Sequence, residues 1–164
     1  MKIPIEISAR HVHLSREHVE KLFGKNYKLK KLKDLSQPGQ FAAKEIVTLI
    51  NGKNKIENVR ILGPERSKTQ AELSTTDARH LKLNLPLKLS GDIKNTPGMI
   101  LKNTKNNKAL KLTKGVMIAQ RHLHCSLNQA KKLKIKNNQI VKIKVLGKRG
   151  LIFNRVSVRV SPLY

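Results

Sequence analysis

One six-residue pattern occurs twice in this chain, at residues 10–15 and 121–126. Both copies read Arg-His-aliphatic-His-x-Ser, and together they hold four of the six histidines. Side chains two residues apart in a β-strand point to the same face, so each His-x-His places two imidazoles side by side. Neutral imidazole binds zinc and related ions well, so the repeat predicts a metal site, with ordinary surface or core histidines as the alternative. The predicted ligands are His11, His13, His122 and His124.

A short helix is expected after each copy of the repeat. Ser15 and Ser126 are good N-cap residues, and each precedes a run of apolar residues at helical spacing. Gln129 stands three residues after Ser126, as in a capping box. We therefore interpret both serines as helix caps. The two remaining histidines, His18 and His80, fit the solvent faces of short helices and are not expected to bind metal.

The chain is strongly basic, with 35 Lys and Arg against 10 Asp and Glu and a formal net charge of +25 over 164 residues. Such a charge can neutralise the phosphates of a nucleic acid, or it can steer an anionic small molecule toward a site. A third explanation is compositional drift toward Lys, Asn and Ile, which gives a lysine-rich surface that has no role in binding. The lysines are scattered, and the absence of Trp, with only three Phe and two Tyr, leaves few side chains for stacking bases. The composition therefore argues against nucleic acid as a partner.

The single cysteine, Cys125, excludes an intrachain disulfide and fits a reducing compartment. It directly follows His124, so in a strand the two side chains face opposite sides. We interpret Cys125 as a small buried apolar residue, with a ligand or a nucleophile as the alternative. No apolar run approaches the length of a transmembrane helix, and a strand pattern begins directly after the first residues. We therefore expect a cytoplasmic protein without a membrane segment or a targeting helix.

Short strands account for most of the predicted structure. Residues 3–7 alternate apolar and polar, as a half-buried strand does. Residues 46–50 and 56–62 flank Asn51-Gly52, which predicts a hairpin with Asn-Gly as its turn. Further strands are expected within 66–74, 87–92, 100–102, 109–112, 116–119, 140–145 and 151–160. Many short strands with few short helices predict a mainly β fold of barrel type.

Besides the repeat, the chain contains several longer motifs in a fixed order. They are Asp34-Leu-Ser-Gln-Pro-Gly-Gln-Phe-Ala-Ala-Lys-Glu45, Leu62-Gly-Pro-Glu-Arg66 continuing through Gln70 and Glu72, Ser90-Gly91-Asp92, and Gly150-Leu-Ile-Phe-Asn154. Together these motifs resemble the PduL-type phosphotransacylases, also called phosphate propanoyltransferases, through essentially the whole chain. The resemblance implies reversible transfer of an acyl group between coenzyme A and inorganic phosphate. The products would be acetyl phosphate or propanoyl phosphate.

The resemblance also implies a fold of two β-barrels capped by short α-helices, with the metal site at the barrel interface. One barrel would combine residues 1–9 with 120–164, and the other would comprise residues 10–119. The family binds two metal ions, usually zinc, and a homodimer is expected. Arg66 matches the family's phosphate-binding arginine, and Ser90 matches a serine near the site, so both are expected as catalytic residues. The positions that match family ligands are His11, His13, Glu72, His122 and His124.

The chain departs from the family pattern at its C-terminal end. Family members continue into a Met-His-Ile-Asp segment that carries a further histidine ligand. The sequence therefore predicts one bound metal with an open position, or a water in place of that ligand, or a truncated form with reduced activity. The alternative function is a catalytically impaired, metal-stabilised β module that binds RNA or DNA through its basic surface.

The expected chemistry suits the matched residues. A Lewis-acid metal polarises a thioester carbonyl, and the forked guanidinium of Arg66 holds a phosphate next to it. Direct attack by phosphate is the first expectation, because a covalent acyl-enzyme needs a nucleophile and only Cys125 or Ser90 offers one. Without the resemblance, Arg66 and Glu72 would be interpreted as a surface ion pair or a solvated strand face.

Overall fold

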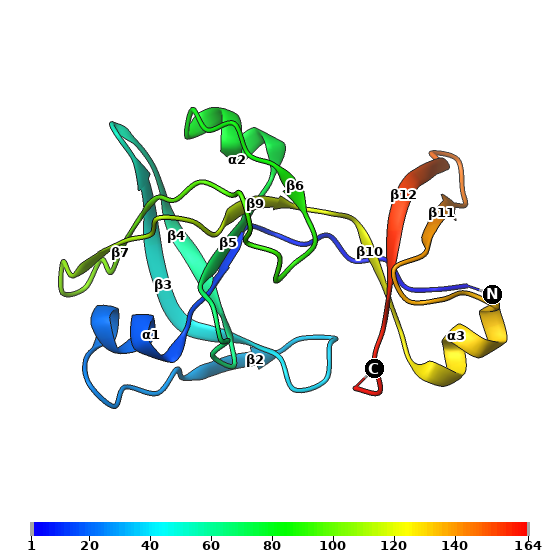
Figure 1. Ribbon diagram of the computed structural model, residues 1–164, viewed down its shortest axis with the longest axis horizontal. Coiled ribbons are helices and arrows are strands. Elements are labelled where there is room, and N and C mark those ends of the chain that lie inside the picture. Colours follow the sequence, from blue (N-terminus) through cyan, green and yellow to red (C-terminus); the bar gives the residue numbers. More distant parts are fainter. Residues whose placement is uncertain (1, 164) are drawn as a thin grey trace. The chain divides into compact units, whose positions relative to one another are not determined.

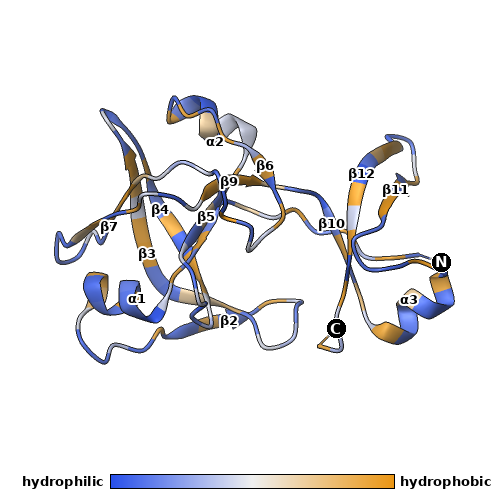
Figure 2. Cartoon of the chain, in the orientation of Figure 1, coloured by the Kyte–Doolittle hydropathy of each residue, from blue (hydrophilic) through white to orange (hydrophobic). Residues whose placement is uncertain are grey.

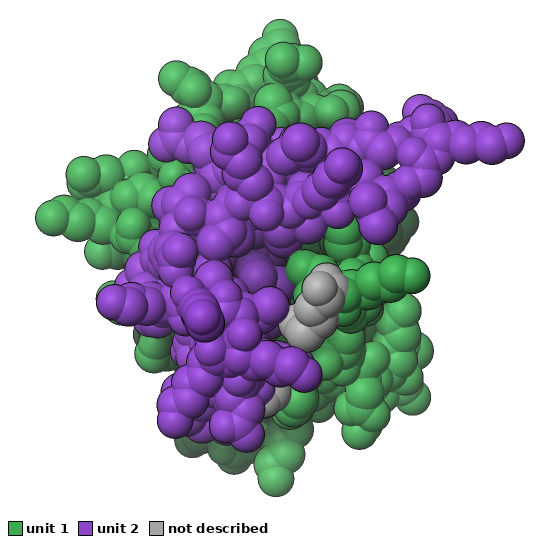
Figure 3. Space-filling model, turned by 90° about the vertical axis from the view of Figure 1, so that its right-hand side faces the viewer, with its two compact units in different colours: residues 1–119 green, residues 120–164 purple. Residues whose placement is uncertain are grey.

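The computed structural model describes residues 2–163, and the chain divides into two compact units, residues 1–119 (unit 1) and 120–164 (unit 2) (Figure 3). The described residues form a mainly β protein with few, short helices (Figure 1). The predicted mainly β class is therefore confirmed. The two closed barrels, a metal site at their interface, and the assignment of residues 1–9 to the same domain as 120–164 stay predictions.

Unit 1 is built on one curled sheet that resembles half of a barrel (Figure 1). Its strands follow the order β6-β9-β5-β1-β4-β3-β7-β8, and β2 pairs with β3. The end strands β6 and β8 are not paired with each other in the described part of the chain. The bounds are β1 His11–His13, β2 Lys31–Asp34, β3 Phe41–Asn51, β4 Asn54–Gly63, β5 Gln70–Leu73, β6 Leu87–Lys88, β7 Ile100–Lys102, β8 Ala109–Lys111 and β9 Val116–Ala119.

The longest strands of unit 1, β3 and β4, form the predicted hairpin. Asn51 pairs with Asn54, so the turn consists of Gly52-Lys53 and lies one residue later than expected. Gly52 has a φ of +57°, a conformation that glycine adopts without a steric penalty. Figure 2 shows apolar stretches along both strands, and the buried core around them includes Val12, Leu14, Val47, Leu49, Val59, Ile61, Ala71 and Leu101.

Two short helices in unit 1, α1 (Arg16–Phe23) and α2 (Thr75–His80), begin at serine caps. The hydroxyl of Ser15 accepts a hydrogen bond from the backbone N–H of His18, as predicted. Ser74 and Asp77 form a complete capping box at the start of α2. Such a cap stabilises a helix by about 1 kcal/mol, which matters for helices this short.

The strand predicted at residues 3–7 is not formed, and residues 2–10 belong to no helix or strand. Ile7 is 97% exposed and Ile5 is half exposed. Alternation of apolar residues favours a strand only where a neighbouring strand supplies hydrogen bonds and a core covers the apolar face. None of the strands in the described part of the chain pairs with residues 2–10.

Unit 2 contains a three-stranded sheet in the order β10-β12-β11 and one helix. The elements are β10 His122–Cys125, α3 Leu127–Leu133, β11 Ile140–Val145 and β12 Leu151–Val160. The predicted capping box between Ser126 and Gln129 is present at the start of α3. Strands β11 and β12 form the predicted hairpin, and β10 runs parallel to β12. Among the described residues, no helix has the length and apolar character needed to cross a membrane.

Candidate metal and phosphate site

The pairing of strands β1 and β5 in unit 1 brings four polar side chains next to one another. Strand β1 is antiparallel to β5, with His11 opposite Glu72 and His13 opposite Gln70. Residues two apart in a strand share a face, and directly opposite residues in neighbouring strands are in contact. All four residues are buried. The first His-x-His thus meets a carboxylate that the chain supplies from a distant segment.

The side chains of His11, His13 and Glu72 have the geometry of a metal-ligand set. One ligand atom from each lies within 4.8 Å of the other two. His11 Nδ1 lies 2.8 Å from the carbonyl oxygen of Ala9, and His13 Nδ1 lies 3.3 Å from that of Leu62. A carbonyl oxygen only accepts, so each Nδ1 carries a proton and donates it, and Nε2 is the ring nitrogen left to face a metal. Two imidazole nitrogens and one carboxylate oxygen are a usual ligand set for zinc, so the residues present fit such an ion.

The electrostatics favour the ligating protonation states of His13 and Glu72. Burial, with added repulsion from Arg66 and His11, lowers the pKa of His13 from 6.5 to about 3, so its imidazole is neutral at pH 7. Burial alone would raise the pKa of Glu72. Its contacts with His11 and the hydrogen bond from Ser90 outweigh this effect and lower the pKa from 4.5 to about 2. A neutral imidazole and an ionised carboxylate are the ligating forms.

The pKa of His13 predicts pH-dependent stability in the metal-free protein. Between about pH 6.5 and pH 3 the unfolded chain binds more protons than the folded chain, so the free energy of unfolding falls as the pH decreases through this window. Glu72 acts in the same direction between about pH 4.5 and pH 2. Urea unfolding in a chelating buffer should therefore show a smaller loss between about pH 7 and pH 5 in His13→Gln than in the wild type. An equal loss in both proteins would contradict this assignment, and His80→Gln serves as the exposed control.

The second copy of the repeat reproduces the local geometry of the first. The rings of His122 and His124 lie 4.7 Å apart at 89°, and those of His11 and His13 lie 4.9 Å apart at 85°. His122 Nδ1 lies 2.8 Å from the carbonyl oxygen of Gln120, as His11 Nδ1 does from Ala9. Burial, with repulsion from His122, lowers the pKa of His124 to about 4. Within residues 2–163, no group of three ligand residues includes this pair, so a second metal ion stays a prediction.

Arg66 and Ser90 lie next to Glu72. Ser90 Oγ accepts a hydrogen bond from Arg66 Nη1 at 3.0 Å and donates one to Glu72 Oε1 at 2.6 Å. The backbone N–H of Arg66 donates to the carbonyl oxygen of Leu14 at 2.9 Å, which ties the arginine to the residue that follows β1. The predicted phosphate-binding arginine is thereby linked through one hydroxyl group to a predicted metal ligand. Their catalytic roles stay predictions.

Two polar residues near the site differ from what the sequence indicated. The sequence indicates Gln70 only as part of a motif and not as a site residue, although it lies two residues before Glu72 and therefore on the same strand face. His18 was expected on a solvent face, but it is half-buried and its Nδ1 lies 2.7 Å from Thr69 Oγ1. The first turn of α1 meets the residue that precedes β5, a contact that helical periodicity alone does not reveal. His80 is exposed, as expected.

The thiol of Cys125 is buried, as predicted for a small apolar residue, with 2% of its surface exposed. Burial raises the pKa of this thiol, which disfavours the thiolate that nucleophilic attack requires. We expect Cys125→Ser to keep the wild-type turnover within about twofold and to lose about 1–3 kcal/mol of stability, because a hydroxyl replaces a buried thiol. Cys125→Ala separates loss of the sulfur from burial of a polar group. Loss of turnover with metal still bound would instead indicate an acyl-cysteine route.

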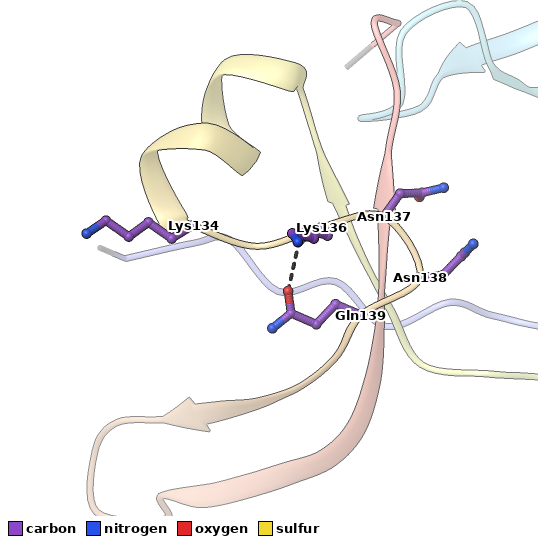
Figure 4. A pocket seen from close by; sticks show the side chains of 5 residues that line it. All are labelled: Lys134, Lys136, Asn137, Asn138 and Gln139. Atoms are coloured by element: carbon purple, nitrogen blue, oxygen red, sulfur yellow. Dashed lines mark hydrogen bonds between the residues drawn. The ribbon is translucent and has the colours of Figure 1, made fainter.

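An open pocket in unit 2 contains none of the predicted site residues (Figure 4). It lies in the loop between α3 and β11, where the backbone N–H of Lys136 donates to Gln139 Oε1 at 2.8 Å. Its lining residues are Lys134, Lys136, Asn137, Asn138 and Gln139. Its lining carries no hydroxyl, thiol, carboxylate or imidazole side chain, so it contains none of the groups expected at the acyl-transfer site.

Comparison with known proteins identifies the family of the chain. A sequence model described as phosphate propanoyltransferase matches residues 4–164. The phosphate propanoyltransferase of Enterococcus faecalis is 49% identical over 160 residues, which cover 98% of this chain and 75% of the relative. That of Clostridioides difficile is 49% identical over 162 residues, covering 99% and 77%. That of Thermotoga maritima is 48% identical over 159 residues, covering 96% and 75%.

These matches extend over nearly the whole chain, and they include the segments that carry both copies of the repeat. They support an acyltransferase, and they agree with the family resemblance of the sequence motifs. The chain belongs to the phosphate propanoyltransferase family.

Proposed function

We propose that this chain transfers an acyl group from acyl-CoA to inorganic phosphate, giving an acyl phosphate and coenzyme A. Propanoyl-CoA and acetyl-CoA are the proposed acyl donors, and zinc is the proposed metal. The observation that carries the proposal is the hydrogen-bonded link from Arg66 through Ser90 to Glu72, within a chain of this family. It connects a permanently charged anion-binding group to a His-His-Glu ligand set.

Different residues of the chain are proposed to bind the phosphate and to hold the metal. A guanidinium group binds phosphate through parallel N–H donors, so Arg66 is proposed to hold and orient the attacking phosphate. His11, His13 and Glu72 are proposed to hold the metal, which when bound supplies Lewis-acid polarisation of the thioester carbonyl. One oxygen of hydrogen phosphate attacks the carbonyl carbon, the carbon–sulfur bond breaks, and the thiolate of coenzyme A leaves and takes up the proton that the phosphate loses.

The hydrogen bonds of Ser90 favour direct attack over an acyl-serine. Its single hydroxyl proton is donated to Glu72, and its oxygen accepts from Arg66 and from Gln70 Nε2 at 2.8 Å. A hydroxyl with two donors on its oxygen has little lone-pair density left for attack. We therefore propose that Ser90 acts by orienting Arg66 and Glu72. The alternative of an impaired nucleic-acid-binding module is not favoured by the comparisons.

The proposal is tested by incubating the purified chain with propanoyl-CoA and phosphate. Free thiol should be released at a rate that depends on phosphate, and propanoyl phosphate should accumulate in phosphorus NMR spectra. A chelator should stop the reaction, and zinc should restore it. Omission of phosphate controls for simple thioester hydrolysis. A zinc-loaded chain that releases no thiol in a phosphate-dependent manner would contradict the proposed function.

A further inference from the structure

The side chain of Gln70 belongs to the same group of four paired residues on β1 and β5 as His11, His13 and Glu72. It is directly opposite His13 and two residues before Glu72 on the same strand face. Only 1% of its surface is exposed. A buried amide is costly unless its polar atoms are hydrogen-bonded, so its partners indicate what it does.

The orientation of the Gln70 amide is fixed by a backbone group. The backbone N–H of Gly91 lies 2.9 Å from Gln70 Oε1, and this group can only donate. The amide oxygen must therefore face Gly91, and the NH2 group must face the site. Gln70 Nε2 donates to Glu72 Oε1 at 2.6 Å and to Ser90 Oγ at 2.8 Å. Both amide protons are thus directed at the groups that link Arg66 to the ligand set.

The two oxygens of Glu72 have different surroundings as a result. Oε1 accepts hydrogen bonds from Gln70 and from Ser90, both at 2.6 Å. Oε2 lies 3.5 Å from His11 Nε2, on the side of the histidine ligands. Two short hydrogen bonds occupy the lone pairs of Oε1, whereas Oε2 faces the nitrogens that would share the metal.

We propose that Gln70 is a positioning residue that makes Glu72 a one-oxygen metal ligand and couples it, through Ser90, to Arg66. This inference rests on the metal site of the proposed function. A carboxylate that binds through one oxygen leaves a coordination position open for a reacting group, as catalytic zinc sites do. The need to donate hydrogen bonds to Glu72 and Ser90 also explains why position 70 is a glutamine. A glutamate at position 70 would repel Glu72, and a histidine would add another imidazole, whereas an amide supplies two protons without charge.

The decisive variant is Gln70→Met, which keeps the length and volume of the side chain and removes its hydrogen bonds. Zinc affinity is measured by competition with a chromophoric chelator, and the absorption spectrum is measured with cobalt(II) in place of zinc. We expect an affinity about 10–100-fold weaker, as is typical when a group that orients a ligand is lost. We also expect an altered cobalt spectrum, because both oxygens of Glu72 become available to the metal.

A matched control is Asn103→Leu, which removes another buried amide in unit 1. Asn103 is 3% exposed, and its Nδ2 donates to the carbonyl oxygen of Leu22 at 2.9 Å. This variant should lose stability but keep the zinc affinity and the cobalt spectrum of the wild type. The comparison separates a general cost of losing a buried amide from an effect on the ligand.

Two results would overturn the inference alone. The first is that the wild type binds zinc and the Gln70→Met variant has the same zinc affinity and the same cobalt spectrum as the wild type. The other concerns the wild type, and it decides the matter even where the variant does not fold. In a nitrogen-15 NMR spectrum, the side-chain amide protons of Gln70 should exchange slowly with solvent and shift on addition of zinc. Fast exchange and no shift would overturn the positioning role. A wild type without zinc affinity would overturn the metal site itself, and this inference with it.

Discussion

Replacement of His11 by alanine is expected to remove the bound metal and to lower kcat/KM for acyl transfer by about a thousandfold. His11 lies opposite Glu72 and supplies one of three clustered ligand atoms, so its loss leaves only two. A Lewis acid at a developing oxyanion is worth several kcal/mol, and ~4 kcal/mol corresponds to about a thousandfold in rate. Metal content per chain and phosphate-dependent thiol release are measured on the same sample.

The control for His11→Ala is His80→Ala, which removes an exposed histidine whose Nε2 lies 3.0 Å from the backbone carbonyl of Lys55. It should keep both metal and activity. A companion variant, His122→Ala, tests the second copy of the repeat, and the duplicated ring geometry predicts that it too loses metal and activity. If His11→Ala keeps its full metal content, the ligand assignment for the first copy is wrong.

Replacement of Arg66 by alanine is expected to raise the KM for phosphate by at least about 100-fold and to leave the KM for acyl-CoA nearly unchanged. Hydrogen bonds to a charged group contribute about 1.5–3 kcal/mol each, and a guanidinium group makes two to an oxyanion. Arg66→Lys keeps the charge but loses the paired donors, so it should give an intermediate value. Initial rates at varied phosphate and varied acyl-CoA distinguish the two constants.

The high net charge of the chain suggests a control for this prediction. If the +25 charge only steers anions toward the protein, removal of any one arginine should have a similar small effect. Arg79→Ala removes an exposed arginine from α2 and should leave both constants unchanged. Equal effects of the Arg66 and Arg79 variants would assign the phosphate dependence to general electrostatics, and the specific role of Arg66 would be refuted.

The sequence was a good guide where structure depends on neighbouring residues. The cap at Ser15 and the capping box from Ser126 to Gln129 follow from side chains that reach only to the next helical turn. The pairing of the imidazoles of His11 and His13 follows from the two-residue repeat of a strand. The long hairpin was also predicted, with its turn displaced by one residue. In each case the determining interactions lie within a few residues of one another.

The predictions from sequence were wrong where the structure of a segment depends on contacts with distant parts of the chain. Residues 3–7 have the alternation of a strand, but none of the strands described within residues 2–163 pairs with this segment. His18 was predicted to face solvent, but its side chain contacts that of Thr69, the residue that directly precedes β5. In both cases the pattern within the segment was real, but its surroundings were set by parts of the chain that local periodicity does not describe.

The candidate site divides in the same way. The sequence by itself determined the His-x-His pairs, and resemblance to a family named Glu72, Arg66 and Ser90 as their partners. Only the tertiary structure decided that β5 lies against β1 in the register that sets Glu72 opposite His11, and that Gln70 directs both amide protons toward Glu72 and Ser90. The physical reason is that strand register and buried hydrogen bonds are chosen by the whole sheet. A one-residue shift of β5 would turn Glu72 and Gln70 to the opposite face and leave the histidines without their carboxylate.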